Sequence, residues 1–203
     1  MVEILEAVHR RLSLLPRRSG PSVEVLKQAL EEVREAVEEV APGFLSGATL
    51  PPREKLLEDA HRLRQGEVPE DSAYAFWLHQ ALRLISWQAD HGKTSGEGWP
   101  ERCPECGGFP DVGYLDADGH RFHLCAFCDT PFRALRLGCP YCGETRADQL
   151  VYYQEDPYRV YVCRSCGERL LVQDLRLKGE LDLPALRARA ALYALAEEKD
   201  VEV

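Results

Sequence analysis

Features that would place the chain in a membrane or outside the cell are missing from its sequence. The 203 residues contain no run of about 18 or more apolar residues, so we expect no transmembrane helix. The N-terminal segment lacks the order of a secretory signal, because its positive charges follow its apolar residues and no small-residue cleavage site is present. We therefore expect a cytoplasmic protein that makes no contact with a membrane.

A concentrated basic surface is also missing. The net charge is −9, and acidic residues outnumber basic residues in every part of the chain. Residues 103–172 carry seven basic and ten acidic groups and contain no lysine. Binding to a phosphate backbone needs clustered Lys and Arg side chains, so this composition argues against nucleic-acid binding.

Cysteine is absent from the first 102 residues, whereas all eight cysteines lie between Cys103 and Cys166. A polar, glycine-containing stretch precedes the first cysteine and is typical of a linker. The composition therefore predicts a helical domain at 1–92, a linker at 93–102, a first four-cysteine metal ribbon at 103–137, a second four-cysteine metal ribbon at 138–175, and a C-terminal helix within 176–203.

Before the linker, apolar residues recur every three or four positions, which is the spacing of amphipathic helices. The last of these segments places Trp77 and Ile85 on one broad apolar face, and we expect its aromatic residues and His79 to pack in a core rather than bind a cofactor. Such apolar stripes must cover one another, so they predict a helical bundle. The helices are expected near Glu3–Leu15 and within residues 21–42, 51–66 and 70–92.

After the linker the pattern changes to that of short strands separated by turns. Asp118-Gly119 suits a tight hairpin turn, and proline near the start of the last segment suits the first turn of a helix. The expected fold class is α+β: an N-terminal helical domain, two tandem rubredoxin-like or zinc-ribbon modules, and a C-terminal helix. Strands are expected at 111–115, 120–125, 149–154, 158–163 and 169–173, and the helix from about Pro184.

The eight cysteines form four Cys-x-x-Cys pairs. A two-residue gap lets the chain form a tight knuckle that directs both sulfurs toward one point, and glycine often follows because the chain there needs a positive φ. Gly107, Gly143 and Gly167 fit this rule, whereas Asp129 does not. Two knuckles supply the four thiolates of a tetrahedral site, so we predict two metal ions, zinc or iron. The predicted ligands are Cys103, Cys106, Cys125, Cys128, Cys139, Cys142, Cys163 and Cys166.

The order of knuckle, hairpin and knuckle occurs twice, and this decides which pairs we expect to share an ion. An antiparallel hairpin returns the chain to its origin, so it brings the second knuckle beside the first. The geometry favours one site formed by the first two pairs and another formed by the last two. The alternative is an interleaved arrangement, in which the first pair joins the third and the second joins the fourth.

Other interpretations of the cysteines are less consistent with the sequence. A disulfide framework needs an oxidising compartment, and a thioredoxin-type catalytic site needs only one pair. His120 and His123 could act as spare ligands, but four sulfurs already complete each site. A closed site of this kind argues against catalysis by the metal. Phe127 and Tyr141, inside two knuckles, are either exposed contacts for a partner or packed against the neighbouring ribbon.

The sequence resembles the FdhE-type formate dehydrogenase accessory proteins. The resemblance rests on "CPECGGFP" (103–110), "RFHLCAFCDTPFRALRLGCPYC" (121–142), "VCRSCGERL" (162–170) and "LPALRARAALYALAEEK" (183–199). Members of this family are longer in the N-terminal region, and they often have Trp at the position of Phe132. The resemblance implies a cytoplasmic maturation factor with rubredoxin-like metal sites that contacts the formate dehydrogenase catalytic subunit.

Three functions follow from these patterns. The first is a non-enzymatic accessory or chaperone-like protein, whose partner is the formate dehydrogenase catalytic subunit as the family resemblance implies. The second is a nucleic-acid-binding zinc-ribbon protein, which the acidic composition disfavours. The third is a rubredoxin-like electron carrier, which requires iron rather than zinc. The residues indicate no catalytic motif, so we expect that the protein is not an enzyme.

Overall fold

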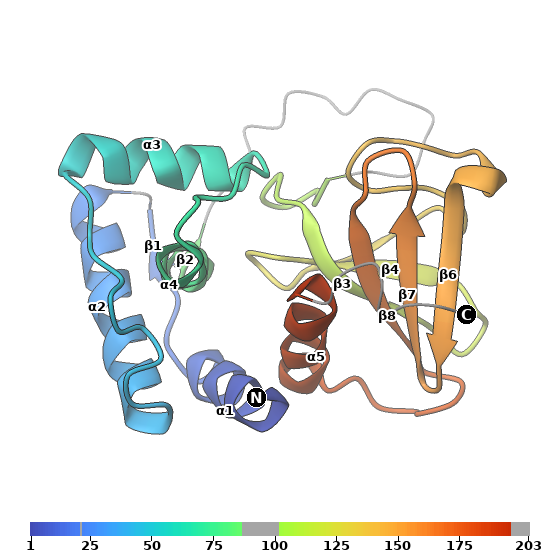
Figure 1. The fold of residues 1–203 in the computed structure, drawn as a ribbon, viewed down its shortest axis with the longest axis horizontal. Helices are drawn as coiled ribbons and strands as arrows, with labels where there is room; N and C mark the ends of the chain where they lie inside the picture. Colours follow the sequence, from blue (N-terminus) through green and yellow to red (C-terminus); the bar gives the residue numbers. More distant parts are fainter. Residues whose placement is uncertain (21, 87–101, 196–203) are drawn as a thin grey trace. The chain divides into compact units, whose positions relative to one another are not determined.

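The computed structural model describes residues 1–20, 22–86 and 102–195 (Figure 1). The chain divides into two compact units, residues 3–89 and 90–203, which we call the helical unit and the sheet unit. The linker expected at 93–102 lies outside the described residues except for Arg102, and so do residues 196–203 of the C-terminal segment. The domain limits expected from the sequence therefore stay predictions.

The helical unit contains the four helices that the apolar spacing predicts. Two of them begin at capping side chains: Ser22 Oγ accepts a hydrogen bond from Val25 N at 3.1 Å, and Asp71 Oδ1 accepts one from Tyr74 N at 3.0 Å. Within the described residues, no helix is both long enough and apolar enough to cross a membrane. The helices are α1 (Val2–Ser13), α2 (Val23–Val40), α3 (Arg53–Arg64) and α4 (Ser72–Arg83).

Helices α2 and α4 form the centre of this unit. Trp77 is buried, and its Nε1–H donates to the carbonyl oxygen of Leu30 at 2.6 Å. The Arg34 guanidinium lies 4.0 Å from the centre of the same ring. The aromatic face of α4 is therefore part of a helical core, as its sequence predicts.

The position of Ile85 differs from the prediction. Helix α4 ends at Arg83, and Ile85 lies in the short strand β2 (Ile85–Ser86), which pairs in parallel with β1 (Arg18–Ser19). Arg18 N also donates to the carbonyl of Leu84, so the chain leaves the helix to complete this pairing. Ile85 is buried as expected, but in a strand rather than on a helical face.

The sheet unit contains the predicted hairpins. Strands β3 and β4 form the first antiparallel pair, and β6, β7 and β8 form an antiparallel series. Strand β5 and a short 3₁₀ helix before β6 have no equivalent in the prediction. The elements are β3 (Pro110–Leu115), β4 (Arg121–Cys125), β5 (Pro131–Arg133), the 3₁₀ helix (Ala147–Gln149), β6 (Leu150–Glu155), β7 (Tyr158–Cys163) and β8 (Arg169–Asp174).

The strands of both metal ribbons belong to one six-stranded sheet with the order β5-β4-β3-β8-β7-β6 (Figure 1). The two halves meet where β3 and β8 run parallel, with Val112 opposite Leu171 and Leu115 opposite Asp174. All other pairings in this sheet are antiparallel. The two predicted modules are therefore joined by backbone pairing rather than only by a connecting loop.

Helix α5 (Leu183–Leu195) covers one face of this sheet. Leu186 is fully buried there in a cluster with residues of β3, β4, β7 and β8, including Val112 and Leu124. A second cluster forms around Leu170 and Val172, which are packed against Tyr141 and Tyr161. The sheet therefore has apolar contacts on both faces, and the cysteine knuckles lie at the ends of its strands.

Candidate metal centres

All four Cys-x-x-Cys segments adopt one backbone turn. In each segment, the N–H four residues after the first cysteine donates to the carbonyl of that cysteine, over 2.7–3.2 Å. The donor residue has a positive φ in every case, which reverses the chain after the second cysteine. The donors are Gly107, Asp129, Gly143 and Gly167, with φ of 71°, 63°, 73° and 77°.

Asp129 therefore follows the same turn although it is not glycine. It is the one non-glycine residue with positive φ in the described part of the chain. Aspartate tolerates this conformation better than most side chains. Its carboxylate also accepts a hydrogen bond from Arg187 Nη1 at 2.7 Å, a contact that glycine could not make. The exception to the glycine rule thus coincides with a tertiary ion pair.

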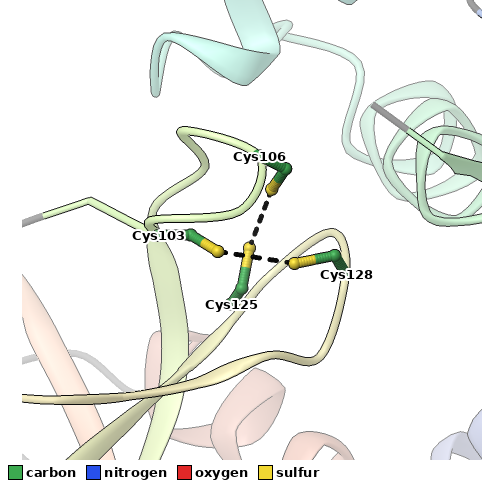
Figure 2. Close-up of side chains that lie close together, drawn as sticks. All are labelled: Cys103, Cys106, Cys125 and Cys128. Carbon is green, nitrogen blue, oxygen red and sulfur yellow. Dashed lines mark hydrogen bonds between the residues drawn. The ribbon is translucent and has the colours of Figure 1, made fainter. Parts of the chain in front are cut away.

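The first cluster joins the first two knuckles (Figure 2). The sulfurs of Cys103 and Cys128 are 3.5 Å apart, and those of Cys106 and Cys125 are 3.3 Å apart. All four sulfurs lie within 4.8 Å of one another and point toward a common centre. The hairpin of β3 and β4 produces this arrangement, because Cys125 ends β4 beside the knuckle that precedes β3.

The second cluster has the same construction. The sulfurs of Cys139 and Cys166 are 3.6 Å apart, and so are those of Cys142 and Cys163. These four sulfurs also lie within 4.8 Å of one another, and Cys163 ends β7 as Cys125 ends β4. The structure thus brings the cysteines together in the sequential arrangement and does not show the interleaved alternative.

The donor set fits a tetrahedral metal ion. Zinc–sulfur bonds of about 2.3 Å in a tetrahedron place neighbouring sulfurs about 3.8 Å apart. The four sulfur pairs given above are 3.3–3.6 Å apart, a few tenths of an ångström below that value. Four sulfur donors favour zinc or iron over magnesium or calcium. The two clusters could therefore hold two metal ions.

A cation would compensate the charge repulsion within each cluster. The contact with Cys103 lowers the pKa of the Cys106 thiol to about 7, whereas burial raises the pKa of Cys139 above that of an ordinary thiol. Four thiolates at these distances repel one another, so the thiols cannot all ionise without a compensating charge. Binding of a divalent ion supplies that charge and releases the thiol protons.

Neither histidine near Cys125 joins the first cluster. His120 Nδ1 lies 3.2 Å from Asp116 Oδ2 in the hairpin turn. His123 is buried against Phe132, with ring centres 5.6 Å apart, and its two ring nitrogens have no hydrogen-bond partner. Burial lowers the pKa of His123 to about 3, so the ring is neutral at pH 7. His123 lies in strand β4, as the sequence predicts, whereas His120 was also expected in this strand and lies in the turn before it.

The first cluster is covered by tightly packed neighbours. Phe127, inside its second knuckle, is buried rather than exposed, and its ring lies beside Gly108 of its own ribbon, so packing against the neighbouring ribbon stays a prediction. Gly108 follows the first knuckle where no larger residue fits: a Cβ atom there would lie 2.6 Å from Phe127 Cδ2 and 3.0 Å from Cys125 Sγ. Thr130 Oγ1 lies 3.2 Å from Cys128 Sγ.

Arg187 of helix α5 connects this cluster to the rest of the sheet unit. Its guanidinium donates to Asp111 Oδ2 at 2.6 Å, to Asp129 Oδ1 at 2.7 Å and to the carbonyl of Cys125 at 3.0 Å. The Arg187 side chain is only 5% exposed, and its two carboxylate partners raise its pKa despite burial. Sequence analysis missed this residue, because its partners lie 58 to 76 positions away.

The second cluster is linked to the first half of the sheet by two side chains. Tyr141 lies inside its first knuckle and donates its hydroxyl hydrogen to the carbonyl of Pro110 at 3.1 Å. Arg121 of β4 is buried, with its guanidinium 4.2 Å from the centre of the Tyr161 ring. Tyr141 therefore packs against the neighbouring half of the sheet rather than projecting as a free contact.

Comparisons with known proteins agree with the cysteine pattern. No family model matches the chain. The chain is 26% identical over 179 residues to a protein named "Protein FdhE homolog" from Rhizobium meliloti (strain 1021), and the match covers 80% of this chain and 57% of that protein. The chain thus spans little more than half the length of this curated relative.

A solved structure shows that the fold is also similar. The crystal structure of the FdhE protein from Pseudomonas aeruginosa superposes with a TM-score of 0.51 and 22% identity, covering 100% of this chain and 84% of that chain. The mixed fold of this chain, with helices followed by a sheet, is thus similar to that of the solved structure. Sequence similarity and fold together support an FdhE-type protein.

Proposed function

We propose that this chain is a non-enzymatic accessory protein of formate dehydrogenase that binds the catalytic subunit of that enzyme. The observation that carries the proposal is the pair of four-cysteine clusters built into one sheet, in a chain similar to FdhE proteins. The resemblance to FdhE-type accessory proteins supports the identity of the partner. It also supports a cytoplasmic location, where such a factor meets its client before assembly.

Each cluster holds one metal ion, zinc or iron, through its four cysteine sulfurs. The ion supplies a cross-link between two knuckles and a charge that compensates the thiolates. With four sulfur ligands in place, the ion has no open position for a substrate. The chemistry of these residues is therefore to hold and orient the strand ends, which supports a binding role rather than catalysis.

The charge distribution separates this proposal from a nucleic-acid-binding ribbon. In the sheet unit two buried arginines near the clusters are engaged within the protein: Arg187 with its two aspartates and Arg121 over Tyr161. The excess of acidic residues repels a phosphate backbone. A rubredoxin-like electron carrier would share the same sulfur sites, so that possibility depends on which metal is bound.

Co-purification tests the proposal. The tagged, metal-loaded chain is mixed at moderate salt with the formate dehydrogenase catalytic subunit, and with an unrelated acidic oxidoreductase subunit as the control. We expect selective retention of the formate dehydrogenase subunit and no shift of DNA or RNA in a parallel gel assay. Equal retention of both subunits, or nucleic-acid binding with a steep salt dependence, would overturn it. Visible absorption of the purified chain distinguishes iron from zinc.

A further inference from the structure

The two clusters use the same donor atoms but differ in their access to solvent. In the first cluster, Cys103, Cys106 and Cys125 are buried and Cys128 is partly buried. In the second cluster, one cysteine of each knuckle is exposed and the other is buried. The exposed residues are Cys142 and Cys166, and the buried residues are Cys139 and Cys163.

The packing around the clusters explains this difference. The first cluster lies beneath the Phe127 ring and beside Gly108, and the Arg187 guanidinium fixes its second knuckle to helix α5. At the second cluster, Gly167 follows Cys166 in open space: apart from its two chain neighbours, no other residue lies within 4 Å of where a Cβ would stand. Phe127, Gly108 and Arg187 therefore pack around the first cluster. The second cluster has an open edge, where Cys142 and Cys166 are exposed to solvent.

The two exposed cysteines form that open edge together. Each is the second cysteine of its knuckle, and their sulfurs lie within 4.8 Å of each other. The first cysteine of each of these knuckles, Cys139 or Cys163, is buried at the end of the sheet. An incoming ligand can therefore approach two neighbouring sulfurs from one side while the remaining two stay anchored.

We propose that the second cluster is an exchangeable metal centre that yields its ion to a soft thiol ligand, while the first cluster is purely structural. This inference rests on the proposal that both clusters bind metal. The partner chemistry is a cysteine thiol of a client protein. In each exchange step one metal–sulfur bond to the chain breaks and one to an incoming sulfur forms, first at Cys142 and Cys166 and then at Cys139 and Cys163, so that four steps release the ion. The proton of the incoming thiol passes to the freed cysteine, and no electron is transferred.

Metal release from the zinc-loaded full chain tests this inference. Wild-type protein with two bound ions is mixed with excess dithiothreitol, used as the soft thiol probe, and a chromogenic zinc chelator reports release. We expect two phases of one ion each, with the fast phase about tenfold or more faster than the slow phase, because two ligands of the second cluster are exposed to the incoming thiol. Release in a single phase would overturn the inference.

Paired variants assign the phases. The variant Cys142→Ser/Cys166→Ser should lose the fast phase and keep the slow one, whereas Cys106→Ser/Cys128→Ser should lose the slow phase. The opposite assignment would overturn the inference. Because a variant can fail to fold, wild-type protein is also alkylated during release and mapped by mass spectrometry. Labelling of Cys142 and Cys166 ahead of Cys106 and Cys128 supports the inference, and simultaneous or reversed labelling contradicts it.

The outcomes separate this inference from the proposed function. Wild-type protein that binds fewer than two ions contradicts the two-ion assignment on which both rest. Two ions released in a single phase refute exchange at the second cluster but leave the accessory role intact. Two phases without co-purification of the formate dehydrogenase subunit support exchange and refute the partner.

Discussion

Replacing Arg187 with methionine should destabilise the sheet unit and weaken metal binding at the first cluster alone. The side chain is 5% exposed, whereas its partners Asp111 and Asp129 are 24% and 32% exposed. Removing one partner of a fully buried ion pair costs about 3–5 kcal/mol, because the other charge stays unpaired. Both aspartates keep contact with water, so we expect a smaller loss than for a fully buried pair, about 2–3 kcal/mol.

Urea unfolding of metal-loaded protein measures this loss. Seven of the eight tyrosines lie in residues 102–195 and all three tryptophans lie in residues 1–99, so the tyrosine near-UV signal reports mainly on the sheet unit. Arg189→Met, on the same helix, is the matched control, since Arg189 contributes mainly a ring contact 4.6 Å from the centre of Tyr158. We expect the control to cost less than about 1 kcal/mol.

A second substitution tests the reason given for Asp129. Without Arg187, Asp129 loses this ion pair but keeps a conformation that glycine adopts in the other three knuckles. Arg187→Met/Asp129→Gly should therefore recover part of the stability that Arg187→Met loses. The reasoning is refuted if Arg187→Met costs less than the control, if both clusters lose metal equally, or if the double variant is no more stable than Arg187→Met.

Three further predictions follow. Gly108→Ala should cost about 1–3 kcal/mol in urea unfolding and speed metal loss from the first cluster, because its Cβ would lie 2.6 Å from Phe127 Cδ2. The control Gly179→Ala places its Cβ in open space and should change stability by less than about 0.5 kcal/mol. Equal effects of the two substitutions would contradict this account. Metal removal should leave most of the far-UV circular dichroism helix signal, because α1–α4 pack in a unit without cysteine; complete loss of that signal would show that the units share one folding transition. The Arg176 guanidinium, with Arg159 beside it, lowers the pKa of Asp174 below that of an unfolded aspartate. Asp174 therefore stabilises the fold at pH values above the unfolded pKa and loses this effect as pH falls through its folded pKa. Asp174→Asn should flatten the acid side of the curve of stability against pH, and an unchanged acid side would count against the ion pairs.

Local patterns in the sequence predicted much of the fold and the grouping of the cysteines. The helices, the two hairpins and the sequential clusters depend on spacing within a few tens of residues, as where the turn Asp118-Gly119 returns Cys125 to Cys103. The parallel pairing of Val112 with Leu171 was not predictable, since nothing local to either strand specifies a partner so distant. Arg187 was missed for the same reason, and Ile85 was misplaced because a helical stripe does not show where strand pairing ends the helix.

X-ray absorption at the metal edge, combined with metal quantification on the purified wild-type chain, tests the central claim most directly. The account predicts two ions per chain, each bound by four sulfur atoms at about 2.3 Å if the metal is zinc. One ion per chain, or nitrogen or oxygen atoms among the direct ligands, would contradict the two four-cysteine centres on which the proposed function and the exchange inference depend.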